Sequence, residues 1–149
     1  MRRFAVIALC LSMGCGIVVG VYCWSVFPSP AVSRALAAKV HLGPGTIIDF
    51  AQIAPFAWDK VFVFHPYTSK ERIDRCLGFR WDSAEWSVID SFDGANLVVF
   101  VRNGAVVCWF DHSRSDGDLM DLADGKGYTR QEAIFRVCLD QEQRLVLAK

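Results

Sequence analysis

One apolar run dominates the hydrophobic pattern of the chain. The segment Phe4–Phe27 contains no charged residue, amide, histidine or proline, whereas apolar and polar positions alternate more evenly from Pro28 onward. At about 1.5 Å per residue, a helix over this run measures roughly 36 Å and exceeds a hydrocarbon core of about 30 Å. A helix with no polar face is unusual inside so small a protein. Residues 1–27 are therefore predicted to form a single transmembrane anchor or signal segment.

The flanks of this segment predict its orientation. Arg2 and Arg3 precede it, and Tyr22 and Trp24 lie near its far end. Cytoplasmic flanks carry an excess of basic residues, and aromatic residues concentrate at membrane interfaces. We therefore expect a cytoplasmic N-terminus and residues 28–149 on the other side of the membrane.

Two other fates of the segment stay open. Cleavage at the A-x-A match Ala35-Leu36-Ala37 would release a secreted protein. Acylation of Cys15, which follows an imperfect lipobox at Ser12-Met13-Gly14, would leave a lipid anchor.

A retained helix has a face of small residues. Ser12, Gly16 and Gly20 recur at four-residue intervals, a spacing that lets a second helix approach closely. A dimer through these residues is possible, although glycine and serine are also common in membrane spans generally.

After the apolar run, residues 28–45 combine three prolines with small residues, which is typical of a Pro/Ala-containing tether. Residues 46–149 then form one soluble domain. Its first strong signal is Lys60–His65, which is apolar at both odd and even positions and predicts an interior strand covered on both faces.

A short helix follows this strand. Thr68 and Glu71 have the spacing of a capping box, and Gly78 is placed to end the helix in a left-handed conformation. Ile73, Cys76 and Leu77 give it a single apolar stripe, so we expect it to pack on a sheet.

Antiparallel strands account for most of the remaining chain. Asn103-Gly104 joins two β-rich runs and is a strong hairpin signal. The predicted strands are 85–90, 97–102, 105–111, 132–139 and 144–148. Together these elements predict an α+β fold, with one small antiparallel sheet packed by a short helix.

The two-residue turn also predicts the hairpin register. Pairing outward from it places Phe100 opposite Val107 and Val98 opposite Trp109, on the same face as Arg102. The other face is wholly apolar and is expected to receive the helix and to bury Cys108.

The first face is the candidate protein-binding surface, formed by Phe100, Arg102, Val107 and Trp109, because exposed Trp, Phe and Arg side chains dominate interface energetics. The alternative is that the C-terminal strands or residues 46–58 cover this face.

Charge and cysteine content exclude several functions. The chain has 16 basic and 16 acidic residues, and without Arg2 and Arg3 the remainder is slightly acidic, which gives no reason to expect nucleic-acid binding. Cys76, Cys108 and Cys138 allow at most one disulfide within the soluble part.

Metal-ligand spacings are lacking in the sequence. The loop 112–128 carries four aspartates without the order of a calcium loop, namely Asp116, Asp118, Asp121 and Asp124. No metal or cofactor is expected.

Catalytic residues are sparse. Cys76 with His65 and Asp74 is the one local set that could form a nucleophilic centre, but Cys76 lies on the predicted core stripe of the helix. Asp59 and Glu71 are a weak acid–base pair, because Glu71 is needed for the helix cap. We therefore expect no enzyme activity, with a thiol-dependent enzyme or redox sensor using Cys76 or Cys138 as the alternative.

The run Trp58-Asp59-Lys60-Val61-Phe62-Val63-Phe64, with Pro66-Tyr67-Thr68, Leu77-Gly78 and Trp81, resembles a family of small bacterial envelope proteins and predicted lipoproteins that has no established activity. At the level of fold, the chain also looks like small outer-membrane assembly lipoproteins and β-lactamase-inhibitor modules. The resemblance implies a protein of the bacterial envelope, and the predicted anchor with its flanks places it in the inner membrane with residues 28–149 in the periplasm or outside the cell. The anchor, the small domain, the abundant aromatics and the lack of a catalytic set lead us to expect a protein-binding role, as an immunity, inhibitor or assembly accessory protein, with a structural envelope component as a further alternative.

Overall fold

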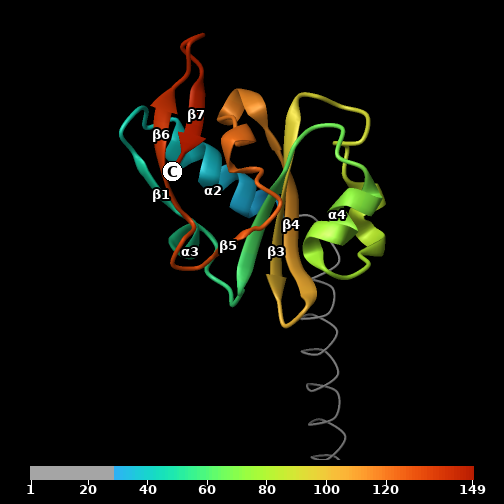
Figure 1. The fold of residues 1–149 in the computed structure, drawn as a ribbon. Helices are drawn as coiled ribbons and strands as arrows, with labels where there is room; N and C mark the ends of the chain where they lie inside the picture. The colour runs from blue at the N-terminus through green and yellow to red at the C-terminus, as the bar shows by residue number, and fades with distance from the viewer. Residues whose placement is uncertain (1–28) are drawn as a thin grey trace, which may run out of the picture.

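The computed structural model describes residues 29–149 (Figure 1). The predicted membrane segment, with Cys15 and the small residues Ser12, Gly16 and Gly20, lies outside the described residues. From Ser29 to Lys149, no helix combines the length and the apolar character needed to cross a bilayer.

Two antiparallel sheets form the domain, which confirms the α+β class and corrects the expectation of a single sheet. The four-stranded sheet has the order β4 (Ala105–Ser113), β3 (Ala95–Arg102), β2 (Lys60–Phe64), β5 (Tyr128–Thr129). The three-stranded sheet has the order β1 (Ile47–Asp49), β6 (Ile134–Leu139), β7 (Leu145–Ala148). The last hairpin thus forms as predicted, but it pairs with β1 instead of closing the first sheet.

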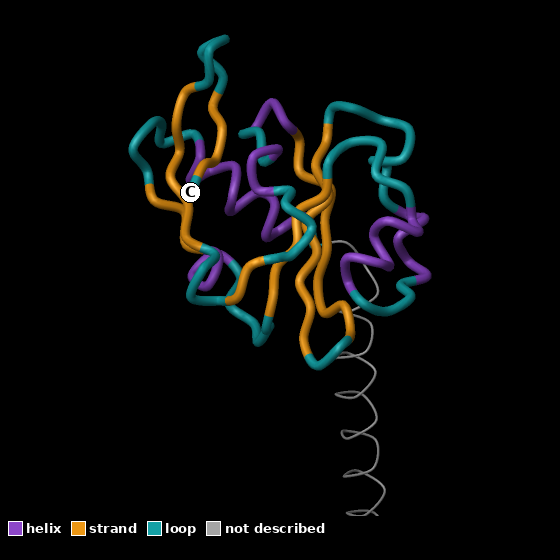
Figure 2. The backbone as a smooth tube through the Cα atoms, viewed as in Figure 1, coloured by secondary structure: helices purple, strands orange, loops and turns teal. Residues whose placement is uncertain are grey.

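Helices fill the space between the sheets and cover the outer face of the larger one (Figures 1 and 2). Helix α2 (Pro30–Val40) and the one-turn α3 (Phe50–Ile53) contribute to the core between the sheets. Helix α4 (Lys70–Leu77) and the 3-10 helix η1 (Asp82–Trp86) pack on the other face of the four-stranded sheet. Two further 3-10 turns, η2 (Arg114–Asp116) and η3 (Met120–Leu122), follow β4.

Helix α2 overturns the expected tether. Val32, Leu36 and Val40 recur every four residues on one face of this helix, and all three are buried in the core between the sheets. Pro30 begins the helix, at a position where its missing N–H costs nothing. Pro30 and the alanines that suggest a spacer are therefore the start and the small-residue side of a packed helix.

Strand β2 is an interior strand, as predicted. It pairs with β3 on one side and β5 on the other. Val61 and Val63 face the core between the sheets, and Phe62 and Phe64 face α4.

Helix α4 forms with its cap displaced by one residue. Ser69 is the N-cap and accepts the Arg72 N–H at 3.4 Å, whereas the Thr68 hydroxyl donates to the His65 carbonyl at 2.7 Å. Thr68 is thus used in the turn before the helix. Gly78 ends the helix with a φ of 80°, as its position in the sequence predicts.

The β3–β4 hairpin contains a bulge that the turn does not predict. Arg102 pairs with Ala105 and Val101 with Val106, but the next pairs are Phe100 with Cys108 and Val99 with Trp109. Val107 is the extra residue, so the predicted register is wrong by one residue beyond it. The predicted strand 85–90 is also wrong, because this segment comprises the end of η1 and an irregular loop.

Candidate functional site

The predicted protein-binding surface does not exist as one face. Because of the bulge, Phe100 and Trp109 lie on opposite sides of the four-stranded sheet, where both are buried. Phe100 is surrounded by the rings of Phe50, Phe56, Trp58 and Phe110, with centroid distances between 5.2 and 6.3 Å. Only Arg102 of the four predicted residues is well exposed, and Val107 is half-buried.

Cys108 is a buried core thiol, as predicted, although it faces the core between the sheets and not α4. It is 1% exposed, and burial raises its pKa to about 11. Cys76, Cys108 and Cys138 are all free thiols. Cys108 therefore remains protonated at neutral pH and contributes to packing.

Within the candidate set of Cys76, His65 and Asp74, the aspartate is engaged by other partners. The Asp74 carboxylate accepts the Trp81 N–H at 2.9 Å and contacts the Lys70 ammonium at 3.5 Å. No hydrogen bond joins any two of the three residues. The other acid–base pair is also engaged, since Asp59 accepts the Asn103 N–H at 2.7 Å.

The acidic loop after β4 is more ordered than a solvated loop. Asp118 is buried and its backbone bonds to the edge of β7, pairing in parallel with Val146. Within residues 29–149 there is no group of three or more His, Cys, Asp or Glu side chains arranged to hold a metal ion.

An exposed apolar cluster lies on the connection between η1 and β3. We call residues 86–93 the aromatic loop. Trp86, Val88 and Phe92 are 53%, 45% and 52% exposed, and the nearby Tyr67 is 64% exposed. Large apolar side chains on a surface are unremarkable singly, but here three lie in one short loop with a fourth beside them.

The inner side of the aromatic loop is fixed to the sheet. Ser87 donates its hydroxyl to Asp111 of β4 at 2.6 Å, and the Val88 N–H donates to the other Asp111 oxygen at 3.2 Å. Ile89 is 1% exposed and belongs to the core beneath α4. Alternate residues of the loop thus anchor it, so that Trp86 and Val88 are held outward.

Tyr67 is joined to the same loop. Its N–H donates to the Ile89 carbonyl, and its backbone has a φ of 61°. A left-handed conformation is uncommon for a tyrosine and costs free energy. Because the Tyr67 side chain is largely exposed, packing within the domain does not offset that cost.

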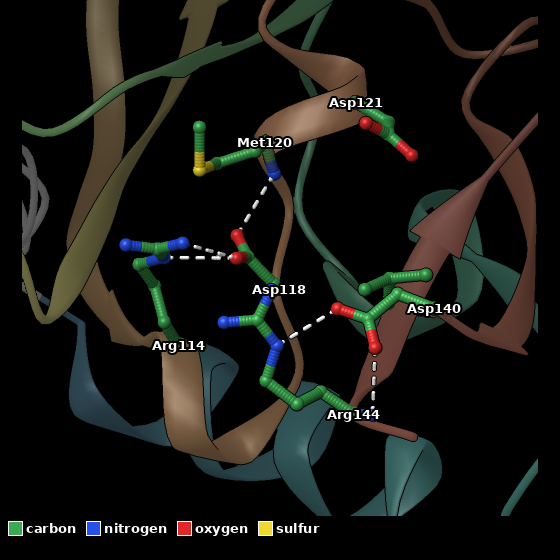
Figure 3. Close-up of a pocket in the computed structure, with 7 residues that line it drawn as sticks. Arg114, Asp118, Met120, Asp121, Asp140 and Arg144 are labelled. Carbon is green, nitrogen blue, oxygen red and sulfur yellow. Dashed lines mark hydrogen bonds and ion pairs between the residues drawn. The ribbon is translucent and has the colours of Figure 1, made fainter. Parts of the chain in front are cut away.

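A charged cleft, whose lining side chains are drawn in Figure 3, lies between the segment that follows β4 and the β6–β7 hairpin. This arginine cleft has a volume of about 240 Å³ and is lined by Arg114, Asp118, Met120, Asp121, Asp140, Arg144 and Val146. An adjoining hollow of about 250 Å³ reaches Asp93 and Gly94. Arg114 donates to the Asp93 carbonyl at 3.0 Å and so connects the cleft to the loop.

Both arginines of the cleft are paired with carboxylates (Figure 3). Arg114 donates two hydrogen bonds to one Asp118 oxygen at 2.8 and 2.7 Å, and Arg144 donates to Asp140 at 2.8 Å. Burial opposes ionisation of Asp118, but the donors Arg114, Asn96 and the Met120 N–H outweigh it and lower the pKa of Asp118. The cleft is therefore an internally neutralised network with one acidic residue, Asp121, in excess.

The sequence does contain a signal for the aromatic loop. In Glu85–Asp90, Trp86 and Val88 alternate with Ser87 and Ile89, and the structure keeps that alternation of exposed and buried side chains without a strand. The alternation alone does not decide whether this segment pairs with a neighbouring strand.

No protein-family model, curated protein or solved structure matches the chain. Function is therefore inferred from the fold and its surface.

Proposed function

We propose that the chain is a membrane-tethered, extracytoplasmic protein-binding module of the bacterial envelope, acting by binding and not by catalysis. The observation that carries this proposal is the set of exposed apolar side chains Trp86, Val88 and Phe92 on a loop whose inner side is fixed to the sheet, with the exposed Tyr67 joined to that loop by a backbone hydrogen bond. Aromatic side chains held in advance in one geometry are typical energetic centres of protein interfaces, because little entropy is lost when a partner covers them.

The membrane tether is proposed from the sequence. The run Phe4–Phe27 is long and apolar enough to span a bilayer, and Pro28 and Ser29 alone separate it from α2. Cleavage after Ala37 would remove Val32 and Leu36 from the core, which supports retention of the whole helix. The domain would then lie directly against the outer surface of the membrane, as expected for an immunity, inhibitor or assembly accessory protein that meets its partner there.

Site-specific photocrosslinking in the native host tests the recognition surface. A photoreactive amino acid replaces Trp86 or Phe92 in the full chain, and Lys126, which is exposed elsewhere, serves as the matched control position. We expect one discrete protein adduct from positions 86 and 92 and none from 126. Equal adducts at all three positions, or none at any, would contradict the proposal.

A reporter enzyme fused after Lys149 tests the membrane topology separately. An enzyme active only outside the cytoplasm should report activity from this fusion. Activity from a cytoplasm-specific reporter instead would show that the domain does not reach the far side of the membrane.

A further inference from the structure

Building on the proposed function, we infer that the partner presents a basic amphipathic segment, in which apolar side chains cover the aromatic loop and flanking lysines or arginines meet its acidic rim. The acidic rim consists of Asp82, Glu85, Asp90 and Asp93, all exposed. Residues 81–101 contain no lysine, arginine or histidine. Arg80 pairs with Asp82 and Arg114 donates to the Asp93 carbonyl, so the charge that borders the apolar surface is mixed, with acidic residues in excess.

Two of the rim carboxylates are free to meet a partner. Asp82 already pairs with Arg80 at 2.6 Å, and Asp90 accepts the Ser91 hydroxyl at 3.0 Å. Glu85 and Asp93 have no side-chain hydrogen bond or ion pair within residues 29–149. Along the chain Glu85 directly precedes Trp86 and Asp93 directly follows Phe92, so an exposed carboxylate is the sequence neighbour of each of these two aromatic residues.

The neighbouring arginine cleft does not reverse this charge. Arg114 and Arg144 are held by Asp118 and Asp140, which leaves neither guanidinium free to attract an acidic partner. Asp121, at the mouth of the cleft, is exposed and adds to the negative charge. A basic segment that extends from the loop toward the cleft would meet favourable potential along its length.

A lipid surface fits this site less well than a protein segment does. Aromatic loops can enter a membrane interface, but anionic leaflets attract basic residues and repel carboxylates. Four acidic side chains around the apolar residues would have to approach that surface or lose their hydration. Complementary charge on a protein segment avoids both costs.

Titration of the full chain in zwitterionic nanodiscs with labelled model peptides tests the inference. The first peptide is a helix with leucines on one face and lysines on the other, and its two analogues carry glutamine or glutamate in place of lysine. Empty nanodiscs correct for lipid binding. We expect the lysine peptide to bind, the glutamine analogue to bind at least about tenfold more weakly, and added salt to weaken the lysine peptide selectively.

Two charge-matched variants locate the interaction. The double variant Glu85→Gln with Asp93→Asn should bind the lysine peptide about fivefold more weakly. The control, Asp59→Asn with Asp124→Asn, removes the same charge away from the loop and keeps the acceptor oxygens that Asp59 and Asp124 use. It should bind as the unaltered chain does. Equal binding of all three peptides, or an equal effect of the two double variants, would overturn the inference.

The native crosslink separates this inference from the proposed function. If position 86 still crosslinks its partner at full yield in the Glu85→Gln, Asp93→Asn chain, the basic-partner inference fails while protein binding stands. Crosslinking of position 86 to lipid in peptide-free nanodiscs, or to a second copy of the chain, would overturn the inference in favour of that other occupant.

Discussion

Ser87 and Asp111 join the aromatic loop to the four-stranded sheet through a hydrogen bond of 2.6 Å. The same carboxylate accepts the Val88 N–H, so one side chain of β4 orders two consecutive residues of the loop. Burial raises the pKa of Asp111, and the Ser87 and Val88 donors partly oppose that rise. The exposed side chains of the loop therefore depend on a polar contact beneath them.

Replacement of Ser87 by alanine should destabilise the domain and weaken partner binding together. The change removes the closest donor to a mostly buried carboxylate, at a cost of about 1–3 kcal/mol in unfolding free energy. Urea denaturation at neutral pH measures this cost. Ser91→Ala is the control, because Ser91 is exposed, its hydroxyl bonds to the exposed Asp90, and its backbone N–H bond to the Val88 carbonyl is kept in the variant. An unchanged urea midpoint in Ser87→Ala would show that the contact does not hold the loop.

Local signals predict the elements of this fold better than their assembly. Gly78, the Asn103-Gly104 turn and the apolar strand β2 each form where the sequence predicts, and the cap of α4 forms one residue later than predicted. The bulge at Val107 carries no such signal. Beyond the bulge, the ring of Trp109 packs against that of Trp81 at 5.6 Å, a tertiary contact between segments distant in the chain that the turn sequence does not reveal.

The bulge and the second sheet together explain why the predicted surface is absent. A shift of one residue transfers a side chain to the opposite face of a strand, so the bulge places Trp109 beneath α4. Phe100 is buried on the other face by residues of the segment 46–58 and by the second sheet, which is the covering that the sequence left open as the alternative. The aromatic loop was not predicted from the sequence, because the alternation of apolar and polar residues in 85–90 predicts a strand. In the structure this segment pairs with no strand and is a loop. Tyr67 joins it only through a backbone hydrogen bond that no sequence spacing reveals.

Acidification should destabilise the domain through His112. This side chain is fully buried on β4, with Ser33 of α2 at 3.3 Å from Nδ1. Burial lowers the pKa of His112, and the nearby Asp116 and Asp118 charges only partly oppose this. The unfolded chain then binds a proton more readily than the folded one, so stability is full above about pH 6.5 and falls as the pH drops below that value.

Denaturation midpoints between about pH 7 and 5 measure this effect, in a range above the titration of ordinary carboxylates. A His112→Gln variant should show a flatter dependence on pH than the unaltered chain, whatever its absolute stability. Parallel curves for the two proteins would assign the acid sensitivity to other groups.

Truncation of Leu36 distinguishes a packed α2 from a tether. Leu36 is fully buried between the sheets, so Leu36→Ala should lower the unfolding free energy by about 2–5 kcal/mol. Lys39→Ala on the exposed side of the same helix should change it by less than about 0.5 kcal/mol. Equal unfolding curves for the two variants would indicate that α2 does not belong to the cooperative core.

Gly127→Ala should be more harmful than Gly104→Ala, although both glycines have left-handed backbones. A Cβ atom at Gly127 would lie 2.8 Å from the Phe62 ring, whereas one at Gly104 would meet nothing within 4 Å. Both variants incur backbone strain, and the first adds crowding of about 1–3 kcal/mol. Thermal unfolding of the two proteins isolates the packing contribution by difference. A smaller loss of thermal stability in Gly127→Ala than in Gly104→Ala would show that the loop around Gly127 moves to make room for the added Cβ atom.

Tyr67→Asn should separate stability from recognition. Asparagine adopts the left-handed conformation at lower cost than tyrosine, so the variant should keep the stability of the unaltered chain or gain up to about 1 kcal/mol. The same change removes a ring that is 64% exposed, and crosslinking of the partner through position 86 should fall. Tyr67→Phe is the matched control, because it retains the ring and the strained backbone and should retain most of the crosslink. A clear loss of stability in Tyr67→Asn would instead show that the ring serves the fold, and Tyr67 would then have no place in the recognition surface.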